Sequence, residues 1–417
     1  MGPEIIVVGT GQFYKEWLGP AIAALQSEGR ANLAATVDLK AADAVPTIRG
    51  IDDTLHLQRR EGVALSDLLA DLHADNPVVV LGHSNESHVN DAWNLLDSGF
   101  RVLMEKPYAL TLNEMMEVHA LARMYQGRVA FGEYYLTFKA APLLALEGML
   151  KPDSFYFTRD GTLTYRQPGW ERLTGGAPAD IFGKQGKLEE LIGKPRYVLS
   201  EVLEGEDLTG IISHRGPHLS DIRIGGGMIQ DLGVHALTTI MALDSYFGKL
   251  DSHFENGEIR IAECRQYAEA VSQQHHIPPE FIGESYAEAK ALTYAGLPIS
   301  LAVGKYVLPN VNQRRLVVVG EHGSAHLDLS SCTLSLTVHD ADLGPVLQAP
   351  KGAQKYYAVL RSALEQLEGN DPFLFPSTGA CLNAQELVLV MQRAAYSSNA
   401  PRARYEQHAM PGSIFKD

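Results

Sequence analysis

The sequence predicts an α/β protein in which a doubly wound parallel sheet is followed by an α+β domain with a large, mostly antiparallel open sheet. Two observations support this prediction. Over the first third of the chain, short apolar runs alternate with amphipathic stretches, as in repeated strand–helix–strand units. From about residue 197, strand-like runs dominate and glycine-rich turns separate them.

Five apolar runs in the first third have the composition of strands that are buried on both faces. They cover residues 5–8, 33–37, 78–81, 102–104 and 129–131. The clearest helix between them begins after Thr111, where Glu114 completes a Thr-x-x-Glu capping box, and Gly127 ends it. Residues 1–135 are therefore predicted to form the doubly wound domain.

The remaining residues, 136–417, are predicted to form the α+β domain. Its expected strands cover 197–202, 287–294, 299–307 and 315–319, and a hairpin through 320–323 leads into 324–329. Two helices are expected at 355–367 and 381–393. Residues 151–187 are rich in Gly, Pro and aromatic residues and lack periodicity, which indicates an insertion. This insertion either caps a substrate pocket or covers an oligomer interface, and the sequence leaves both open.

Composition narrows the function. The 417 residues are 45% apolar, and 35 Lys+Arg against 50 Asp+Glu give a net charge of −15. Such a charge repels nucleic acid and anionic lipid, which argues against roles at either. With no apolar run near ~18 residues and no basic signal region, we expect a cytoplasmic protein. The cysteines Cys264, Cys332 and Cys381 are far apart, which suits a reducing compartment.

A glycine turn between the first strand and the first helix indicates a nucleotide site. In such a turn, backbone N–H groups and the helix N-terminus can approach a pyrophosphate. Asp38 ends the second strand, where an acid accepts the ribose hydroxyls of NAD and repels a 2′-phosphate, although Lys40 lies two residues further on. NAD is therefore predicted, with NADP as the alternative. The turn reads Gly9-Thr10-Gly11-Gln12-Phe13-Tyr14, with Tyr14 where a third glycine is usual.

Three further motifs follow in order, and together they resemble the Gfo/Idh/MocA family of oxidoreductases. The family's Asn-x-x-His is similar to Asn85 and His88, which follow the strand 78–81. Its Glu-Lys-Pro is similar to Glu105-Lys106-Pro107, and its Gly-Gly-Gly-x-x-x-Asp-x-Gly-x-His is similar to residues 225–235. The resemblance covers nearly the whole chain, apart from the insertion.

The resemblance implies a Rossmann domain that binds NAD(P) and a second domain that binds substrate and commonly packs against a neighbouring subunit. It implies an enzyme that acts on CH–OH groups of a sugar, nucleotide sugar, cyclitol or related polyol, and a homo-oligomer, either dimer or tetramer. The residues that we expect at the cofactor are Gly9, Thr10, Gly11, Gln12, Phe13, Asp38, Ser84, Asn85, His88, Glu105 and Lys106.

The catalytic candidates are Lys106, Asp231 and His235. An enzyme that oxidises an alcohol must remove the hydroxyl proton, and histidine suits that step because its pKa lies near neutrality. Asp231 precedes His235 by one helical turn, so it can orient the imidazole or bind a substrate hydroxyl. The ammonium of Lys106 can polarise the reacting oxygen. The bland alternatives are a surface lysine, a buried structural His235 and a structural His88.

No metal is assigned. The spacing of His214 and His218 suits a metal, but the Gly216-Pro217 pair between them is incompatible with a helix. Two other functions stay open. One is a redox-neutral sugar-modifying enzyme that holds NAD tightly and oxidises its substrate transiently. The other is a non-catalytic NAD-binding regulatory protein, like a fungal repressor of the same family, for which Lys106, Asp231 and His235 have no use.

Overall fold

The fold is described from a computed structural model of the chain. Most of the predicted insertion at 151–187 lies outside the described residues; within it, only the paired strands β7 (Phe155–Phe157) and β8 (Leu163–Tyr165) and Lys187 are described. The described residues are 2–51, 54–60, 62–72, 74, 76–133, 139–147, 155–157, 163–165, 187–205, 219–248, 258–305, 312–339, 341–348, 356–369, 378–396 and 402–405.

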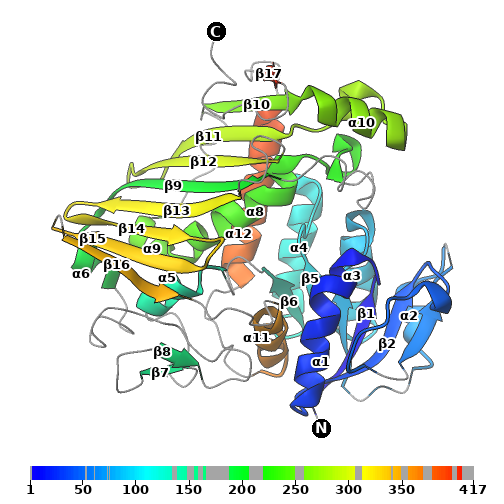
Figure 1. Ribbon diagram of the computed structural model, residues 1–417. Coiled ribbons are helices and arrows are strands. Elements are labelled where there is room, and N and C mark those ends of the chain that lie inside the picture. Colours follow the sequence, from blue (N-terminus) through cyan, green and yellow to red (C-terminus); the bar gives the residue numbers. More distant parts are fainter. Residues whose placement is uncertain are drawn as a thin grey trace.

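The first sheet is parallel throughout, and its strand order is β3-β2-β1-β4-β5-β6 (Figure 1). The chain moves outward in one direction from β1 and then in the other from β4, so the order reverses between these two strands. In doubly wound sheets, ligands bind beyond the carboxyl ends of the strands at such a reversal. The strands are β1 (Glu4–Val8), β2 (Asn32–Asp38), β3 (Leu55–Gln58), β4 (Val78–Leu81), β5 (Arg101–Glu105) and β6 (Val129–Gly132).

The predicted doubly wound sheet is thus confirmed, with one strand more than the sequence indicated. β3 is an edge strand with half-exposed and exposed side chains, so it lacks the apolar run by which its neighbours were found. The helices of this region are η1 (Tyr14–Leu18), α1 (Gly19–Ser27), η2 (Ala42–Ala44), α2 (Leu65–Leu69), η3 (Asn85–Ser87), α3 (His88–Asp97) and α4 (Leu112–Met124).

The capping box before α4 is confirmed. The Thr111 hydroxyl accepts a hydrogen bond from Glu114 N at 3.1 Å, and the Glu114 carboxylate accepts one from Leu110 N at 2.7 Å. α4 ends at Met124 with Tyr125 as its C-cap, and Gly127, which was predicted to end it, has a φ of +79° in the turn just beyond. This cap fixes the start of α4 directly after the loop that follows β5.

The second sheet has the order β16-β15-β14-β13-β9-β12-β11-β10-β17, and all neighbours are antiparallel except β9 with β12 and β10 with β17. The α+β prediction is confirmed, as is the hairpin at 320–323, which joins β13 to β14. The strands are β9 (Pro195–Glu204), β10 (Ile259–Cys264), β11 (Tyr286–Leu292), β12 (Pro298–Lys305), β13 (Gln313–Gly320), β14 (Gly323–Asp328), β15 (Thr333–Val338), β16 (Ala341–Gln348) and β17 (Arg402–Tyr405).

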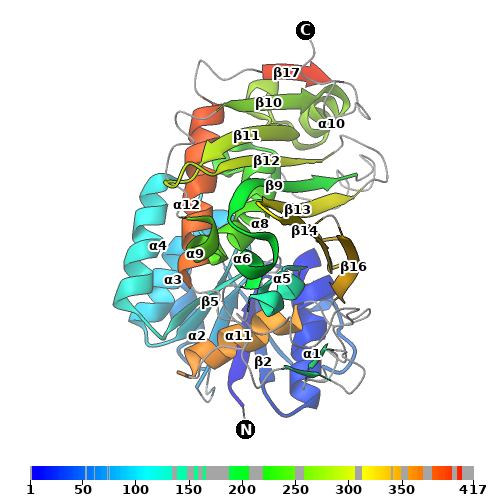
Figure 2. The ribbon, with the colours of Figure 1, turned by 90° about the vertical axis from the view of Figure 1, so that its left-hand side faces the viewer.

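Two long helices lie between the sheets (Figures 1 and 2). α8 (Met228–Ala242) packs on β9 and β12 of the second sheet, and α12 (Thr378–Ala395) packs against both α8 and α4. Gly233 permits this close approach, because a Cβ there would lie 2.8 Å from Val388 Cγ2. The other helices are α5 (Ala141–Leu146), α6 (Lys187–Ile192), η8 (Ile222–Ile224), α9 (Asp244–Phe247), α10 (Arg265–His275), η10 (Pro279–Phe281) and α11 (Tyr357–Leu367).

α11 returns the chain to the first sheet, where it packs on β6 and α1. The Tyr357 hydroxyl donates a 2.6 Å hydrogen bond to Glu28 beyond the end of α1. We propose 1–135 and 136–417 as the two domains, with α11 of the second covering part of the first. Among the described residues, no helix is both long and apolar enough to cross a membrane.

Candidate functional site

The glycine turn after β1 has the backbone that a close nucleotide contact requires. Gly9 has a φ of +97°, and a Cβ there would lie 2.8 Å from the backbone of Gly82 and His83, which follow β4. A Cβ at Gly11 would meet nothing within 4 Å, so the turn is open on that side. The helical run that starts at Gln12 presents its N-terminus to the same space. These features fit a dinucleotide pyrophosphate.

Asp38 stands at the carboxyl end of β2 and is tied to this turn. Its Oδ2 accepts hydrogen bonds from Thr10 N at 2.6 Å and Thr10 Oγ1 at 2.7 Å, and its Oδ1 accepts one from Lys40 N at 3.1 Å. Burial raises the pKa of Asp38, but these hydrogen bonds outweigh burial and hold it below the usual value. The residue is therefore an ionised carboxylate at neutral pH, which is the form that accepts ribose hydroxyls.

Phe13 links the turn to the C-terminal part of the chain. Its ring meets that of Tyr356 edge to face, with centroids 5.0 Å apart. Tyr356 directly precedes α11 and is buried, and its hydroxyl has no hydrogen-bond partner among the described residues. Tyr356, which lies more than 300 positions further along the chain, thus packs beside the predicted cofactor turn.

The Asn85–His88 motif forms a 3₁₀ turn and the first residue of α3. His88 is 1% exposed; its Nδ1 lies 3.3 Å from the carbonyl of Pro107 and its Nε2 lies 3.1 Å from that of His83. Burial lowers the pKa of His88 to about 3, so its ring is neutral. The ring joins the loops that follow β4 and β5, as in the structural alternative, and contacts of Ser84, Asn85 and His88 with a cofactor stay a prediction.

The three glycines before α8 each occupy a position without room for a side chain. Gly225 and Gly227 have φ of +80° and +112°, and a Cβ at Gly226 would overlap the backbone of Asp221. At Gly227 a Cβ would lie 2.6 Å from the Glu284 carboxylate, which accepts a hydrogen bond from Ile229 N at 2.6 Å. The motif thus turns the chain tightly and lets Glu284 cap the N-terminus of α8.

Lys106 and Asp231, which are 125 residues apart in sequence, meet where β5 ends. Lys106 Nζ lies 3.0 Å from Asp231 Oδ1 and donates to the Asp231 carbonyl at 2.9 Å. Lys305, at the end of β12, lies 2.7 Å from Asp231 Oδ2 and 3.1 Å from Glu204 Oε2. Glu204 in turn accepts a hydrogen bond from Arg314 at 2.6 Å. The site therefore contains a chain of alternating charges.

The cations beside Glu204 hold its carboxylate in the ionised form. Burial raises the pKa of Glu204, but Lys305 and Arg314 outweigh burial and lower it below the usual value. The side chain of Lys305 is only 2% exposed, whereas that of Lys106 is 21% exposed. Of the two ammonium groups on Asp231, that of Lys106 is thus the one that solvent, and by extension a small molecule, can reach.

His235 lies one turn after Asp231 on α8, as predicted, and is 9% exposed. Its Nδ1 lies 2.7 Å from Oε1 of Glu133, whose side chain is fully buried. Glu133 directly follows β6 and so lies at the carboxyl edge of the first sheet. The structure thus brings Lys106, Asp231 and His235 into one region and adds a carboxylate that pairs with the histidine.

Sequence reasoning missed Glu133, Glu204, Lys305 and Arg314. For Glu133 a signal existed, because it lies two residues after the predicted strand 129–131 of the parallel sheet, and positions just beyond such strands gather at the edge where ligands bind. Lys305 and Glu204 end strands of the second sheet. Lys305 lies inside the predicted strand 299–307 and Glu204 lies beyond the predicted strand 197–202, and neither belongs to a motif that would mark it. Their partnership depends on the parallel pairing of β9 with β12.

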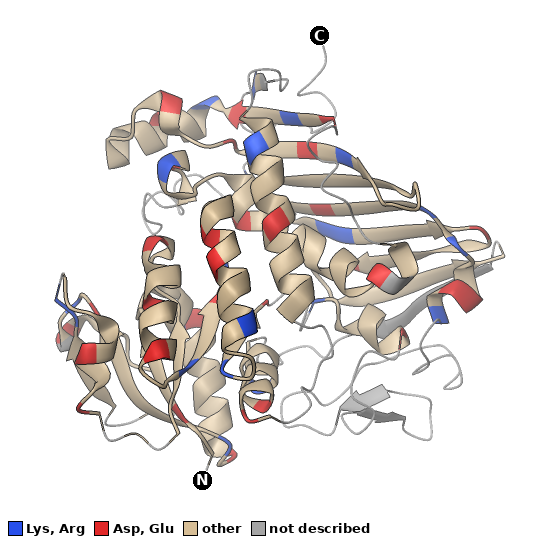
Figure 3. Ribbon diagram, turned by 180° about the vertical axis from the view of Figure 1, so that it is seen from behind, with Lys and Arg blue, Asp and Glu red and all other residues tan. Residues whose placement is uncertain are grey.

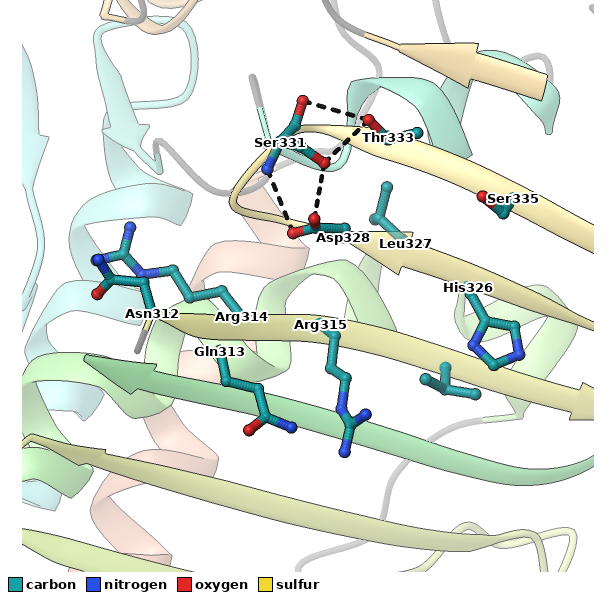
Figure 4. A pocket seen from close by; sticks show the side chains of 11 residues that line it. Asn312, Gln313, Arg314, Arg315, His326, Leu327, Asp328, Ser331, Thr333 and Ser335 are labelled. Atoms are coloured by element: carbon teal, nitrogen blue, oxygen red, sulfur yellow. Dashed lines mark hydrogen bonds between the residues drawn. The ribbon is translucent and has the colours of Figure 1, made fainter. Parts of the chain in front are cut away.

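An open groove of about 500 Å³ lies on the second sheet, over β13, β14 and β15 (Figure 4). It is lined by polar side chains such as Arg315, His326 and Asp328, and it contains none of Lys106, Asp231 and His235.

Among the described residues, which exclude His214 and His218, no group of three or more His, Cys, Asp or Glu has the arrangement of a metal site. Basic and acidic residues are interspersed along the ribbon in Figure 3.

Comparisons with known proteins agree with this geometry. The chain is similar to the biliverdin reductase of a Synechocystis strain, solved with biliverdin and NADP⁺ (15% identity, 94% of this chain and 98% of that chain, TM-score 0.61). It is similar to a UDP-N-acetylglucosamine 3-dehydrogenase from Acidithiobacillus ferrooxidans (16%, 94% and 96%, TM-score 0.57). It is also similar to a 3-ketoreductase from Actinomadura kijaniata, solved with TDP-benzene and NADP (14%, 97% and 100%, TM-score 0.59). At these identities the likeness shows the fold.

A search of curated proteins finds no significant match. A family model does match: residues 4–133 fit GFO_IDH_MocA, described as an oxidoreductase family with an NAD-binding Rossmann fold. This description and the glycine turn agree on a nicotinamide dinucleotide as the cofactor. The resemblance that the sequence motifs indicated is thereby confirmed over residues 4–133, which match the model of the Gfo/Idh/MocA family of oxidoreductases.

Proposed function

We propose that the protein interconverts a secondary alcohol and a ketone on a sugar, nucleotide sugar, cyclitol or related polyol. The observation that carries this proposal is the convergence of Lys106, Asp231 and His235 at the carboxyl edge of the cofactor-binding sheet. Two of the similar structures are named as a nucleotide-sugar 3-dehydrogenase and a 3-ketoreductase, which supports this substrate class. A third is a biliverdin reductase, so the fold also serves other substrates.

Each residue of the site has a role in the proposed reaction that follows from its chemistry. The bound nicotinamide supplies the hydride acceptor or donor. His235 takes the hydroxyl proton of the alcohol as the carbonyl forms, and returns it in the reverse direction. Lys106 donates a hydrogen bond to the reacting oxygen and stabilises the negative charge that develops there. Asp231 holds the Lys106 ammonium in place at 3.0 Å.

We propose NAD rather than NADP as the cofactor. The carboxylate of Asp38 is ionised and lies where the ribose of the adenosine half is expected, so it favours free hydroxyls and repels a 2′-phosphate. Lys40 is exposed beside it and is the group that would favour NADP instead.

The first test is thermal unfolding with saturating NAD⁺, NADH, NADP⁺ or NADPH. A ligand at 100 times its Kd adds about 2.7 kcal/mol to the folded state, so the midpoint rises by a few degrees for the bound pair. We expect the NAD pair to give the larger shift and D38A to reduce it. If none of the four nucleotides shifts the unfolding midpoint and the protein releases no nucleotide on denaturation, the proposal is contradicted. Released nucleotide would instead indicate the redox-neutral, tightly bound case.

The second test uses the pair of nucleotides that binds and a screen of polyols and keto sugars, with turnover followed through nicotinamide absorbance. With any substrate found, K106A and H235A should each lower kcat by a hundredfold or more, the usual worth of an acid–base or oxyanion-stabilising group. E117Q on the exposed face of α4 serves as the control and should match the wild type. Wild-type turnover in both K106A and H235A would refute the assigned roles.

A further inference from the structure

A cluster of buried side chains, most of them outside the predicted residues, surrounds the end of β6. Glu133 follows β6, Glu105 ends β5, and Tyr108, Tyr356 and Cys381 lie close by. The side chain of Glu133 is 0% exposed, and its Oε1 lies 2.7 Å from His235 Nδ1. A fully buried carboxylate is costly unless a cation or hydrogen bonds compensate it, and the imidazole of His235 is one such partner.

We propose that Glu133 is a positioning residue for His235: the two form a buried carboxylate–imidazole dyad in which Glu133 fixes the ring and stabilises its protonated form. With Glu133 ionised, Nδ1–H of the imidazole donates to Oε1, and this hydrogen bond leaves Nε2 as the nitrogen that exchanges a proton with substrate. The inference rests on the proposed function for its catalytic meaning, but the dyad itself is a property of the protein without substrate.

As the alcohol is oxidised, its C–H bond breaks and the hydride leaves to the oxidised nicotinamide, while its O–H bond breaks and the proton moves to Nε2. Two electrons leave with the hydride, and the C=O bond forms. The imidazolium that results is adjacent to the Glu133 carboxylate, which does not take up the proton itself. The proton passes from Nε2 to solvent before the next turnover.

Glu105 determines which carboxyl of the cluster carries the charge. Its side chain extends over Gly132, where a Cβ would overlap Glu105 Oε1, and Oε1 has no hydrogen-bond partner among the described residues. Burial and the neighbouring Glu133 raise the pKa of Glu105 well above its usual value. Two adjacent buried carboxyls cannot both ionise at low cost, so Glu105 is the one that keeps its proton.

Other charges surround the dyad and have partners of their own. Asp231 on α8 is paired with Lys106 from β5 and Lys305 from β12, and Lys305 is also paired with Glu204 from β9. Cys381 on α12 stays a neutral thiol, because burial raises its pKa to about 12. Glu133 is therefore the carboxylate whose removal should act most directly on the His235 ring.

The experiment is an acid–base titration of His235 by NMR in [¹⁵N]histidine-labelled full-length protein, with H235N to assign the signal. In E133Q the ring should protonate at a pH lower than in the wild type by about one unit or more, which is the effect of removing an adjacent opposite charge. In E105Q, which mimics the protonated acid, the titration should match the wild type. An unchanged midpoint in a folded E133Q, or an equal shift in E105Q, overturns the proposal.

The chain offers a matched control in a second Glu–His pair. Glu386 Oε2 lies 3.1 Å from His119 Nε2, but these side chains are 51% and 32% exposed. E386Q should leave the His235 titration unchanged and move that of His119 only slightly, because solvent screens the exposed pair. If E133Q does not fold, E133D replaces it: the shorter carboxylate withdraws from Nδ1, so the His235 midpoint must still fall, and an unchanged midpoint overturns the proposal.

This titration needs no substrate. A failure of the dyad proposal is therefore distinguishable from a failure of the proposed function, which is tested by thermal unfolding with nucleotides and by the kinetics of K106A. When a substrate is in hand, E133Q should lower kcat by tenfold or more through the protonation step, with KM and the Kd of the nucleotide nearly unchanged. An E133Q enzyme with wild-type kcat over the whole pH range would show that the dyad is structural only.

Discussion

At the scale of single residues, the site depends on polar groups that were placed in the interior with defined partners. His88 is an example, since it is neutral, buried and held between two backbone carbonyls from different loops. A neutral imidazole has one N–H, so it can donate to only one of the two carbonyls at a time. The ring therefore acts as a spacer between the loops after β4 and β5, the second of which follows Lys106 directly.

His88 gives a prediction for the pH dependence of stability. The folded protein holds its pKa at about 3, below the usual 6.5, so the stability it contributes is present above pH 6.5 and is lost as pH falls. The free energy of unfolding should decrease by about 1.4 kcal/mol between pH 7.5 and 5.5 from this residue alone. Urea unfolding of H88N should show a pH dependence weaker by that amount.

The quantity to compare is the difference in the free energy of unfolding between wild type and H88N at each pH, because the chain contains other histidines. H276N is a suitable control, since His276 is exposed at the end of α10. Parallel pH profiles for wild type and H88N would contradict the buried, neutral state of His88.

At the scale of elements, the site is built by one helix, α8, that is positioned at its N-terminus and at its middle. Glu284 caps α8 at its N-terminus, and Gly233 in its middle brings it against α12. Asp231 and His235 lie on either side of Gly233, so the depth of α8 in the interface determines how far they reach toward Lys106 and Glu133. Element packing and site geometry are therefore coupled here.

This coupling predicts that G233A destabilises the protein by about 1–3 kcal/mol, since overpacking a dense interface costs that much. The added methyl would lie 2.8 Å from Val388 Cγ2. V388A makes room for it, so the double variant G233A/V388A should recover stability relative to the sum of the two single changes. Chemical denaturation of the four proteins measures this coupling, and strictly additive effects would show that the contact is not tight.

At the scale of the whole molecule, packed helices connect the two sheets. α11 follows the second sheet in the chain and packs on the first, and α12 packs against both α8 and α4. Arg101 of β5 also donates to the carbonyl of Leu367 at the end of α11, at 3.2 Å. The interior is thus continuous between the two sheets, and one hydrophobic cluster includes residues from both.

We therefore expect the protein to unfold in one transition even when the contact between the sheets is weakened. Leu360 on α11 is 0% exposed, and L360A should cost about 2–5 kcal/mol through the cavity it leaves. Calorimetry should show a single peak at lower temperature. M116A, on the exposed surface of α4, should leave the peak in place. Two separated peaks in L360A would show that the first sheet unfolds independently of the second.

The sequence by itself determined the parallel sheet, the helix cap at Thr111, the hairpin at 320–323, the glycine turn and the three family motifs. These features are local, because an apolar run, a capping pair or a glycine with positive φ depends on neighbours within a few residues. Lys106, Asp231 and His235 were found in the same way, since their motifs are contiguous.

The tertiary structure alone decided which charges meet. Glu133 reaches His235 only because β6 ends near α8, and Lys305 reaches Asp231 only because α8 packs on β12. Likewise, Tyr356 faces Phe13 because α11 crosses back to the first sheet. A buried charge is tolerated only beside its partner, and that partner is fixed by packing between elements far apart in the chain, which no local pattern in the sequence records.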